Sequence, residues 1–326
     1  AYEMQSSLVG SEMCIRDRFT GGCIGGKGAT PVTAYELKNY NQDLYQGKLY
    51  AEELCVAQND VALEGYTEDT ELHSAALFDL TGERVLYSYK AHERLYPAST
   101  TKIMTALLAI ENANLDDQVT ISGNADASSF PADAQVCGLA KGEVWTLRDL
   151  LGALLLYSGN DAATAIAEYV GGSEEAFVNM MNRRAQELIA NGTHFMNPHG
   201  LHDDNHYTTA YDLYLIFNEC IKHEDFVNII QSEAYTAYYT DVDGNSQEAL
   251  FTPTNLYAQG EVDVPENVTI VGGKTGTTDE AGYCLILMEK DSSDNPYISI
   301  VMGASEKPVL YEDMTSLIEA IPSGQQ

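Results

Sequence analysis

The stretch YPASTTK, residues 96–102, decides the fold and supplies the first candidate for chemistry. Pro97 favours the start of a helix, because its fixed φ suits the first turn and its missing N–H would have no partner there. Apolar residues at helical spacing follow as far as Ile110 and predict a buried helix. Ser99 and Lys102 are three residues apart, so on a helix the lysine can reach the serine hydroxyl.

A hydroxyl is a weak nucleophile that needs a base, and a neutral lysine amine can be that base. The helix N-terminus adds free N–H groups near Ser99, which suit a developing oxyanion. A Ser-x-x-Lys spacing alone occurs by chance about once in a chain of this length. An exposed serine and lysine without a role is therefore the plain alternative.

Strand and helix patterns follow a definite order along the chain. A hairpin is expected from the β-prone runs His73–Asp79 and Arg84–Tyr89. Helical periodicity dominates from about residue 120 to 235, where Thr209 with Asp212 predicts a capped helix start. The later elements are expected to be three strands and a last helix: 269–274, 283–288, 297–302 and 311–321. Because strands at both ends must join one sheet, the helical block is an insertion in an α/β (α+β) fold.

The tripeptide Ser158-Gly159-Asn160 follows one predicted helix and precedes another. Gly159 is expected to break the first helix and to let two short polar side chains project together. The alternative is a helix-ending turn in which Asn160 is the N-cap.

The stretch Lys274-Thr275-Gly276-Thr277 lies at the end of a predicted strand. Lys274 offers an ammonium group, and Thr275 and Thr277 offer hydroxyls. Gly276 has no side chain, so a substrate backbone can lie against the strand edge. A given tripeptide arises by chance in roughly one chain in twenty-five of this length, so this motif is moderately specific.

Composition excludes some classes of protein. The 326 residues include 49 acidic and 17 basic side chains, a formal net charge of −32. Nucleic-acid binding needs clustered Lys and Arg, so no nucleic-acid partner is expected, and the charge fits the solvated surface of a secreted protein. A hydrophobic fraction of 44% predicts a globular chain. The six cysteines have no CxxC pair and no zinc spacing, so they leave the redox compartment open.

The first residues need separate treatment. Residues 8–18, LVGSEMCIRDR, resemble the translation of a sequencing-library adapter, so 1–18 are interpreted as an artefact and left out of the fold. Residues 19–48 are expected to be a tether or poorly ordered leader. Cys23, in a Gly-rich stretch, resembles a lipoprotein cleavage site, and an ordinary linker is the alternative.

The three motifs, in this order and on these kinds of element, resemble those of the low-molecular-mass serine D-Ala-D-Ala carboxypeptidases, penicillin-binding proteins of the β-lactamase/transpeptidase-like superfamily. Further shared stretches are Tyr157–Ala163, Asn197–Leu201 and His206–Ala210. The likeness covers about residues 49–321, leaving 322–326 as a tail. It implies an antiparallel sheet flanked by helices with an inserted all-helical subdomain at about 120–235.

The resemblance implies an extracytoplasmic hydrolase without a cofactor that removes the terminal D-alanine from peptidoglycan stem peptides. Ser99 would be acylated by the D-Ala-D-Ala end, or by β-lactam antibiotics as covalent inhibitors. Lys102 would take its proton as a neutral amine, which burial and Lys274 nearby would favour. Ser158 would relay a proton to the departing D-alanine, and Asn160 would hold the peptide amide and orient the base.

The same resemblance places the terminal carboxylate of the substrate on Lys274, Thr275 and Thr277, beside Gly276. Backbone N–H groups of Ser99 and Thr277 would form the oxyanion hole. Membrane attachment, if present, would come from the N-terminal region or from Cys23.

Three alternatives remain open from the sequence. A class A β-lactamase needs a Glu for deacylation; the run Glu187–Asn191 imitates that signature, but it is expected to continue a helix to a C-cap at Asn191-Gly192. A penicillin sensor would be acylated without turnover. Four histidines between residues 194 and 206 suggest a metal, but their spacing matches no zinc pattern, so structural roles are expected.

Overall fold

The computed structural model describes residues 53–63, 74–266 and 268–322. The adapter-like segment, the tether and Cys23 lie outside these residues. Among the described parts of the chain, no helix has the length and apolar character needed to cross a membrane.

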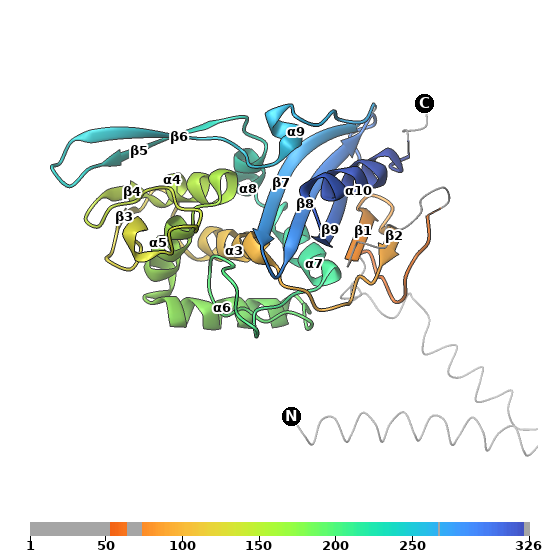
Figure 1. Ribbon diagram of the computed structural model, residues 1–326, viewed down its shortest axis with the longest axis horizontal. Coiled ribbons are helices and arrows are strands. Elements are labelled where there is room, and N and C mark those ends of the chain that lie inside the picture. The colour runs from red at the N-terminus through yellow and green to blue at the C-terminus, as the bar shows by residue number, and fades with distance from the viewer. Residues whose placement is uncertain (1–52, 64–73, 267, 323–326) are drawn as a thin grey trace, which may run out of the picture. The chain divides into compact units, whose positions relative to one another are not determined.

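A five-stranded antiparallel sheet joins strands from both ends of the described chain, in the order β2-β1-β9-β8-β7 (Figure 1). The bounds are β1 Ser74–Asp79, β2 Arg84–Tyr89, β7 Val268–Thr278, β8 Gly282–Asp291 and β9 Pro296–Ala304. The predicted hairpin and the three late strands are therefore confirmed. Strand β7 lies at an edge of this sheet.

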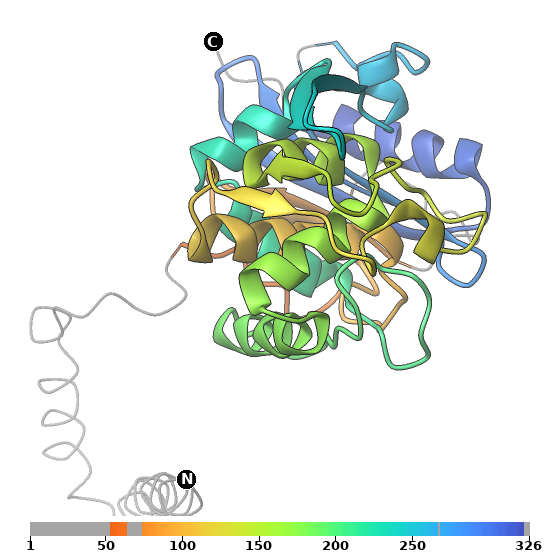
Figure 2. The same ribbon diagram turned by 90° about the vertical axis from the view of Figure 1, so that its left-hand side faces the viewer.

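Helices cover both faces of the sheet (Figures 1 and 2). Successive residues of β8 point to opposite sides: Leu285 and Leu287 join the apolar core under α10 (Lys307–Glu319), while Ile286 and Met288 join the larger core formed with the other helices. This alternation is what a strand buried on both faces requires. The predicted fold class, helices flanking an antiparallel sheet, is confirmed.

The larger core is built mainly from helices between β2 and β7. Their bounds are η2 Ala98–Thr101, α3 Lys102–Asn112, α4 Leu147–Gly152, η4 Ala153–Tyr157, α5 Asn160–Gly171, α6 Glu174–Glu187, α7 Ala210–Cys220 and α8 Glu224–Ile230. The short α9, Leu256–Gln259, packs instead into the core under α10. The predicted cap of α7 is confirmed, because the Thr209 hydroxyl accepts the backbone N–H of Asp212 at 3.0 Å.

This inserted block is not purely helical, contrary to expectation. A second antiparallel sheet runs β3-β4-β5-β6, from strands Gln118–Thr120, Val144–Thr146, Tyr235–Thr240 and Ser246–Phe251. Two of its strands have three residues, too few to show a period of two. The ring of Trp145 on β4 stacks on Tyr239 of β5, with centroids 4.2 Å apart, so a contact between distant segments stabilises the pairing.

Two predicted helix boundaries were each wrong by four residues (307 against 311, and 187 against 191), about one turn. The last helix begins at Lys307 rather than Tyr311, because Pro308 fits its first turn. Helix α6 ends at Glu187 rather than at Asn191, since Ile189 has a left-handed backbone with φ +60°.

Candidate active site

Ser99 and Lys102 lie at the junction of η2 and α3, where the predicted helix begins as a tighter 3₁₀ turn. The Nζ of Lys102 is 2.9 Å from the Ser99 hydroxyl. Residue Ala98, just before the serine, has φ +47°, an uncommon conformation for a residue with a side chain. The serine therefore follows a sharply bent segment of backbone.

The amine of Lys102 is completely buried among oxygen atoms. Besides Ser99, it contacts the side-chain oxygen of Asn160 at 2.7 Å and the backbone oxygen of His199 at 2.6 Å. Burial, and secondly the positive charge of Lys274, hold the pKa of Lys102 well below its usual value. This environment favours a neutral amine, which is the form that can accept a proton.

The segment Ser158–Asn160 adopts the turn that presents two polar side chains, but not in the way predicted. The π-helix η4 ends at Tyr157, and Ser158, its C-cap, has φ +72°, whereas Gly159 is extended. Glycine is needed at 159 for another reason: a Cβ there would lie 2.2 Å from the sulfur of Cys137. Asn160 is not the N-cap either; it is the first residue of α5, and its side chain bonds Lys102.

Asp161, a residue outside the three predicted motifs, supports this turn. It is buried, and its carboxylate accepts backbone N–H groups of Cys137, Gly138 and Leu139 at 2.9 to 3.1 Å. Its carboxylate thus holds the loop that packs against Gly159. The only signal for this role in the sequence was its position directly after the Ser158-Gly159-Asn160 motif.

Lys274, on strand β7, is the last polar side chain of the candidate site. It is buried, and its Nζ donates to the Ser158 hydroxyl at 2.9 Å and to the Thr275 carbonyl at 2.9 Å. Burial lowers the pKa of Lys274 to about 7. The hydroxyl of Thr275 contacts that of Thr254 at 2.6 Å, while Thr277 is exposed on the same strand.

Gly276 lies against the backbone of the nucleophile segment. A Cβ at this position would approach the Pro97 oxygen at 2.9 Å and the Ser99 nitrogen at 3.0 Å. Any larger residue would push the strand edge away from η2. The structure therefore brings the three predicted motifs into one site, from segments 58 to 116 residues apart.

The four histidines that suggested a metal do not converge. Their imidazole rings face four different partners: Asn205 for His194, Phe130 for His199, Asp204 for His202 and Thr101 for His206. The role of His199 lies in its backbone oxygen on Lys102, which no side-chain pattern could have indicated. The only signal for His199 in the sequence was that it lies in Asn197–Leu201, one of the stretches that resemble the carboxypeptidases.

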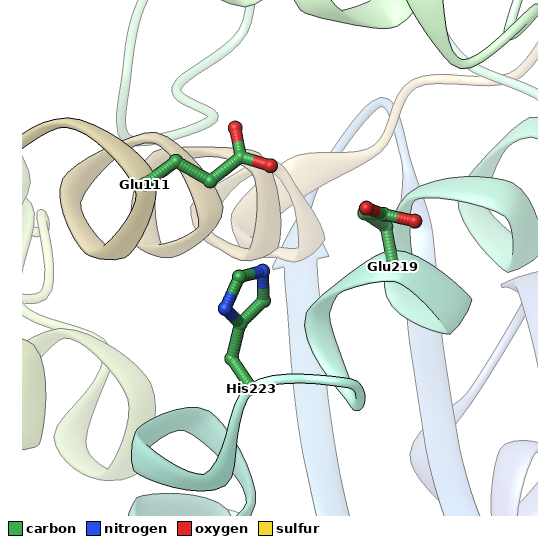
Figure 3. A group of neighbouring side chains, drawn as sticks. All are labelled: Glu111, Glu219 and His223. Atoms are coloured by element: carbon green, nitrogen blue, oxygen red, sulfur yellow. The ribbon is translucent and has the colours of Figure 1, made fainter.

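One group in the described part of the chain could gather three metal-ligand atoms: Glu111 at the end of α3, Glu219 on α7 and His223 before α8 (Figure 3). Both carboxylates already have cationic partners. Arg184 contacts Glu111 at 2.7 Å and Glu219 at 3.3 Å, and Lys222 donates to Glu219 at 2.7 Å. We interpret the group as an ion-pair network between helices.

A partly buried serine beside a buried lysine at the start of a helix, completed by a second serine and by a lysine from the edge strand β7, defines a nucleophilic hydrolase site. The comparison with known families agrees: the profile described as D-alanyl-D-alanine carboxypeptidase, peptidase family S11, matches residues 62–306. The chain belongs to this family.

Known relatives give the same result. The D-alanyl-D-alanine carboxypeptidase DacF of Bacillus subtilis is 34% identical over 254 residues, which cover 76% of this chain and 61% of that protein. DacC of Escherichia coli is 31% identical, with 74% and 59% covered. The chain thus spans about three fifths of the length of these curated relatives.

Solved structures resemble the described fold. The Streptomyces K15 DD-transpeptidase superposes with a TM-score of 0.71 at 28% identity, covering 78% of this chain and 98% of that one. Penicillin-binding protein 5 of Haemophilus influenzae gives a TM-score of 0.68 at 27% identity, with 78% and 72% covered.

Proposed function

We propose that the protein is a serine D-Ala-D-Ala carboxypeptidase that removes the terminal D-alanine from peptidoglycan stem peptides outside the cytoplasm. The observation that carries this proposal is the buried Lys102 amine, 2.9 Å from Ser99 and 2.7 Å from Asn160. Family membership and the names of the relatives support the substrate. β-Lactams would acylate the same serine.

In the first step, the Ser99 hydroxyl attacks the carbonyl carbon of the penultimate D-alanine and gives its proton to Lys102. The buried, neutral amine can accept that proton because its pKa is lowered. Backbone N–H groups of Ser99 and Thr277 would stabilise the oxyanion, a contribution of about 3 kcal/mol per donor.

In the second step, the peptide C–N bond breaks and the leaving D-alanine nitrogen takes up the proton that Lys102 accepted in the first step, which leaves Lys102 neutral again. Ser158 is the proposed relay of this proton. Its hydroxyl accepts a hydrogen bond from Lys274, and the residue lies two positions before Asn160 in the sequence. Lys274, Thr275 and Thr277, on the edge strand β7, would bind the carboxylate of that D-alanine. Water then hydrolyses the acyl-enzyme and frees Ser99.

Labelling with a fluorescent penicillin, alongside a D-alanine release assay on a pentapeptide, tests this function. The wild type should take up label and release D-alanine, and Ser99→Ala should do neither. Label that persists in Ser99→Ala would show that another residue is the nucleophile. Rapid penicillin turnover would instead indicate a β-lactamase, and acylation without D-alanine release a penicillin sensor.

A further inference from the structure

A single peptide group, the one joining His199 to Gly200, connects the Lys102 amine to the side chain of Asn197. Its carbonyl oxygen accepts from Lys102 Nζ at 2.6 Å. Its N–H donates to the Asn197 side-chain oxygen, also at 2.6 Å. A rotation of this peptide plane would break both hydrogen bonds together.

The contacts of Lys102 differ in kind. The Asn160 side-chain oxygen and the His199 carbonyl can only accept hydrogen bonds, whereas the Ser99 hydroxyl can donate or accept. A neutral amine has two N–H groups and one lone pair. With both N–H groups held by the two acceptors, the lone pair is left for the proton of Ser99.

We propose that Asn197 is a positioning residue that fixes the His199–Gly200 peptide group and thereby directs the lone pair of neutral Lys102 at Ser99. The inference rests on the proposed serine hydrolase function. Asn197 also accepts the His199 N–H at 3.3 Å and donates to the Leu201 carbonyl at 2.9 Å, so one amide closes the whole turn.

Two further contacts hold this turn against the nucleophile. Gly200 has φ +88°, and a Cβ there would lie 1.9 Å from the Ala98 oxygen, so the turn packs directly on the backbone before Ser99. The Thr105 hydroxyl, one turn after Lys102 on the same helix, donates to the Pro198 carbonyl at 2.6 Å and is buried. Thr105 is therefore a second anchor of the same peptide segment.

The test compares Asn197→Leu with Asn182→Leu. Asn182 clamps the other end of the same segment in the same way, accepting the Phe195 N–H and donating to the Phe195 carbonyl, both at 2.8 Å. Penicillin acylation rates are measured from pH 5 to 10, together with melting temperatures. Asn197→Leu should lower the plateau rate about a hundredfold, the effect of a displaced catalytic group. Asn182→Leu should lose stability only.

The acid limb of the rate profile separates positioning from simple damage. The His199 oxygen binds the ammonium form more strongly than the amine, so its loss should lower the pKa of Lys102 and move the limb to lower pH. Asn197→Asp, which keeps the acceptor oxygen, should retain most of the plateau rate. Thr105→Val should shift the profile in the same direction as Asn197→Leu.

A lysine ¹³Cε NMR titration gives a readout without any substrate. The Lys102 pKa should be lower in Asn197→Leu and unchanged in Asn182→Leu. Equal titration in the two variants, or an unmoved acid limb in Asn197→Leu, would overturn the positioning role. A wild type that neither binds penicillin nor releases D-alanine would overturn the proposed function, while the titration would still decide the role of Asn197.

Discussion

Lys274 donates to the hydroxyl of Ser158 at 2.9 Å across 116 residues of sequence. Both side chains are buried, so this hydrogen bond joins the edge of the main sheet to the turn between η4 and α5. The same ammonium raises the cost of charging Lys102, because two buried cations repel each other. In the proposed mechanism, Lys274 would therefore act both on the substrate carboxylate and on the pKa of the base Lys102.

Lys274→Gln should raise the pKa of Lys102, since the neighbouring positive charge that destabilises its ammonium is removed. A higher pKa means that the neutral amine forms at higher pH, so the acid limb of the acylation profile should move upward. KM for a carboxylate-bearing peptide should rise about ten- to a hundredfold. Lys222→Gln, the same charge change at an exposed lysine, should leave the acid limb and KM unchanged. An unmoved acid limb in Lys274→Gln would contradict the effect of the Lys274 charge on the pKa of Lys102.

Gly159→Ala should destabilise the protein by about 1–3 kcal/mol and lower activity, because the new methyl group would overlap the Cys137 sulfur. Urea unfolding and D-alanine release measure the two effects. The double variant Gly159→Ala/Cys137→Gly removes the overlap and should recover most of both. If it does not, the carboxylate of Asp161, 2.8 Å from the added methyl, is the main obstacle.

Thr254→Val should raise KM roughly three- to tenfold with little change in kcat. When Thr254 donates to the Thr275 hydroxyl, the Thr275 proton is free to point to the substrate carboxylate; valine removes that constraint. Steady-state kinetics on the peptide measure the effect, and Thr252→Val, at an exposed position in the same loop, is the matched control. A fall in kcat at constant KM would argue against a binding role.

Glu289→Gln should stabilise the protein increasingly as pH rises. Glu289 is buried on β8, and burial raises its pKa to about 8 from 4.5, although hydrogen bonding to Ser299 opposes this rise. Between these two values the folded state binds more protons than the unfolded state, so the wild-type free energy of unfolding falls with rising pH. Tyr257 is a titratable neighbour, but it remains neutral in this window because burial raises its pKa to about 12.

Urea denaturation at pH 5 and pH 8 measures the difference. The free energy of unfolding of Glu289→Gln should change less than that of the wild type between the two pH values, because glutamine cannot ionise. An equal change in the free energy of unfolding of the two proteins would show that Glu289 does not titrate in this range.

The late strands could be predicted because each has enough residues to show its pattern, and the cap at Thr209 because it depends on neighbours in the chain. The second sheet could not, since β3 and β4 exist only through pairing with distant partners. The reason for Gly159 was also missed: its constraint is the sulfur of Cys137, 22 positions earlier, rather than its own φ.

The sequence by itself determined that Ser99 and Lys102 are neighbours, because helical geometry brings residues three apart onto one face. It also supplied the three motifs and their order. Only the tertiary structure decided that Lys102 is buried beside a second cation, and that a backbone carbonyl of His199, 97 residues away, is its third partner. Burial and distant main-chain contacts depend on how the chain packs, and no local pattern of side chains encodes them.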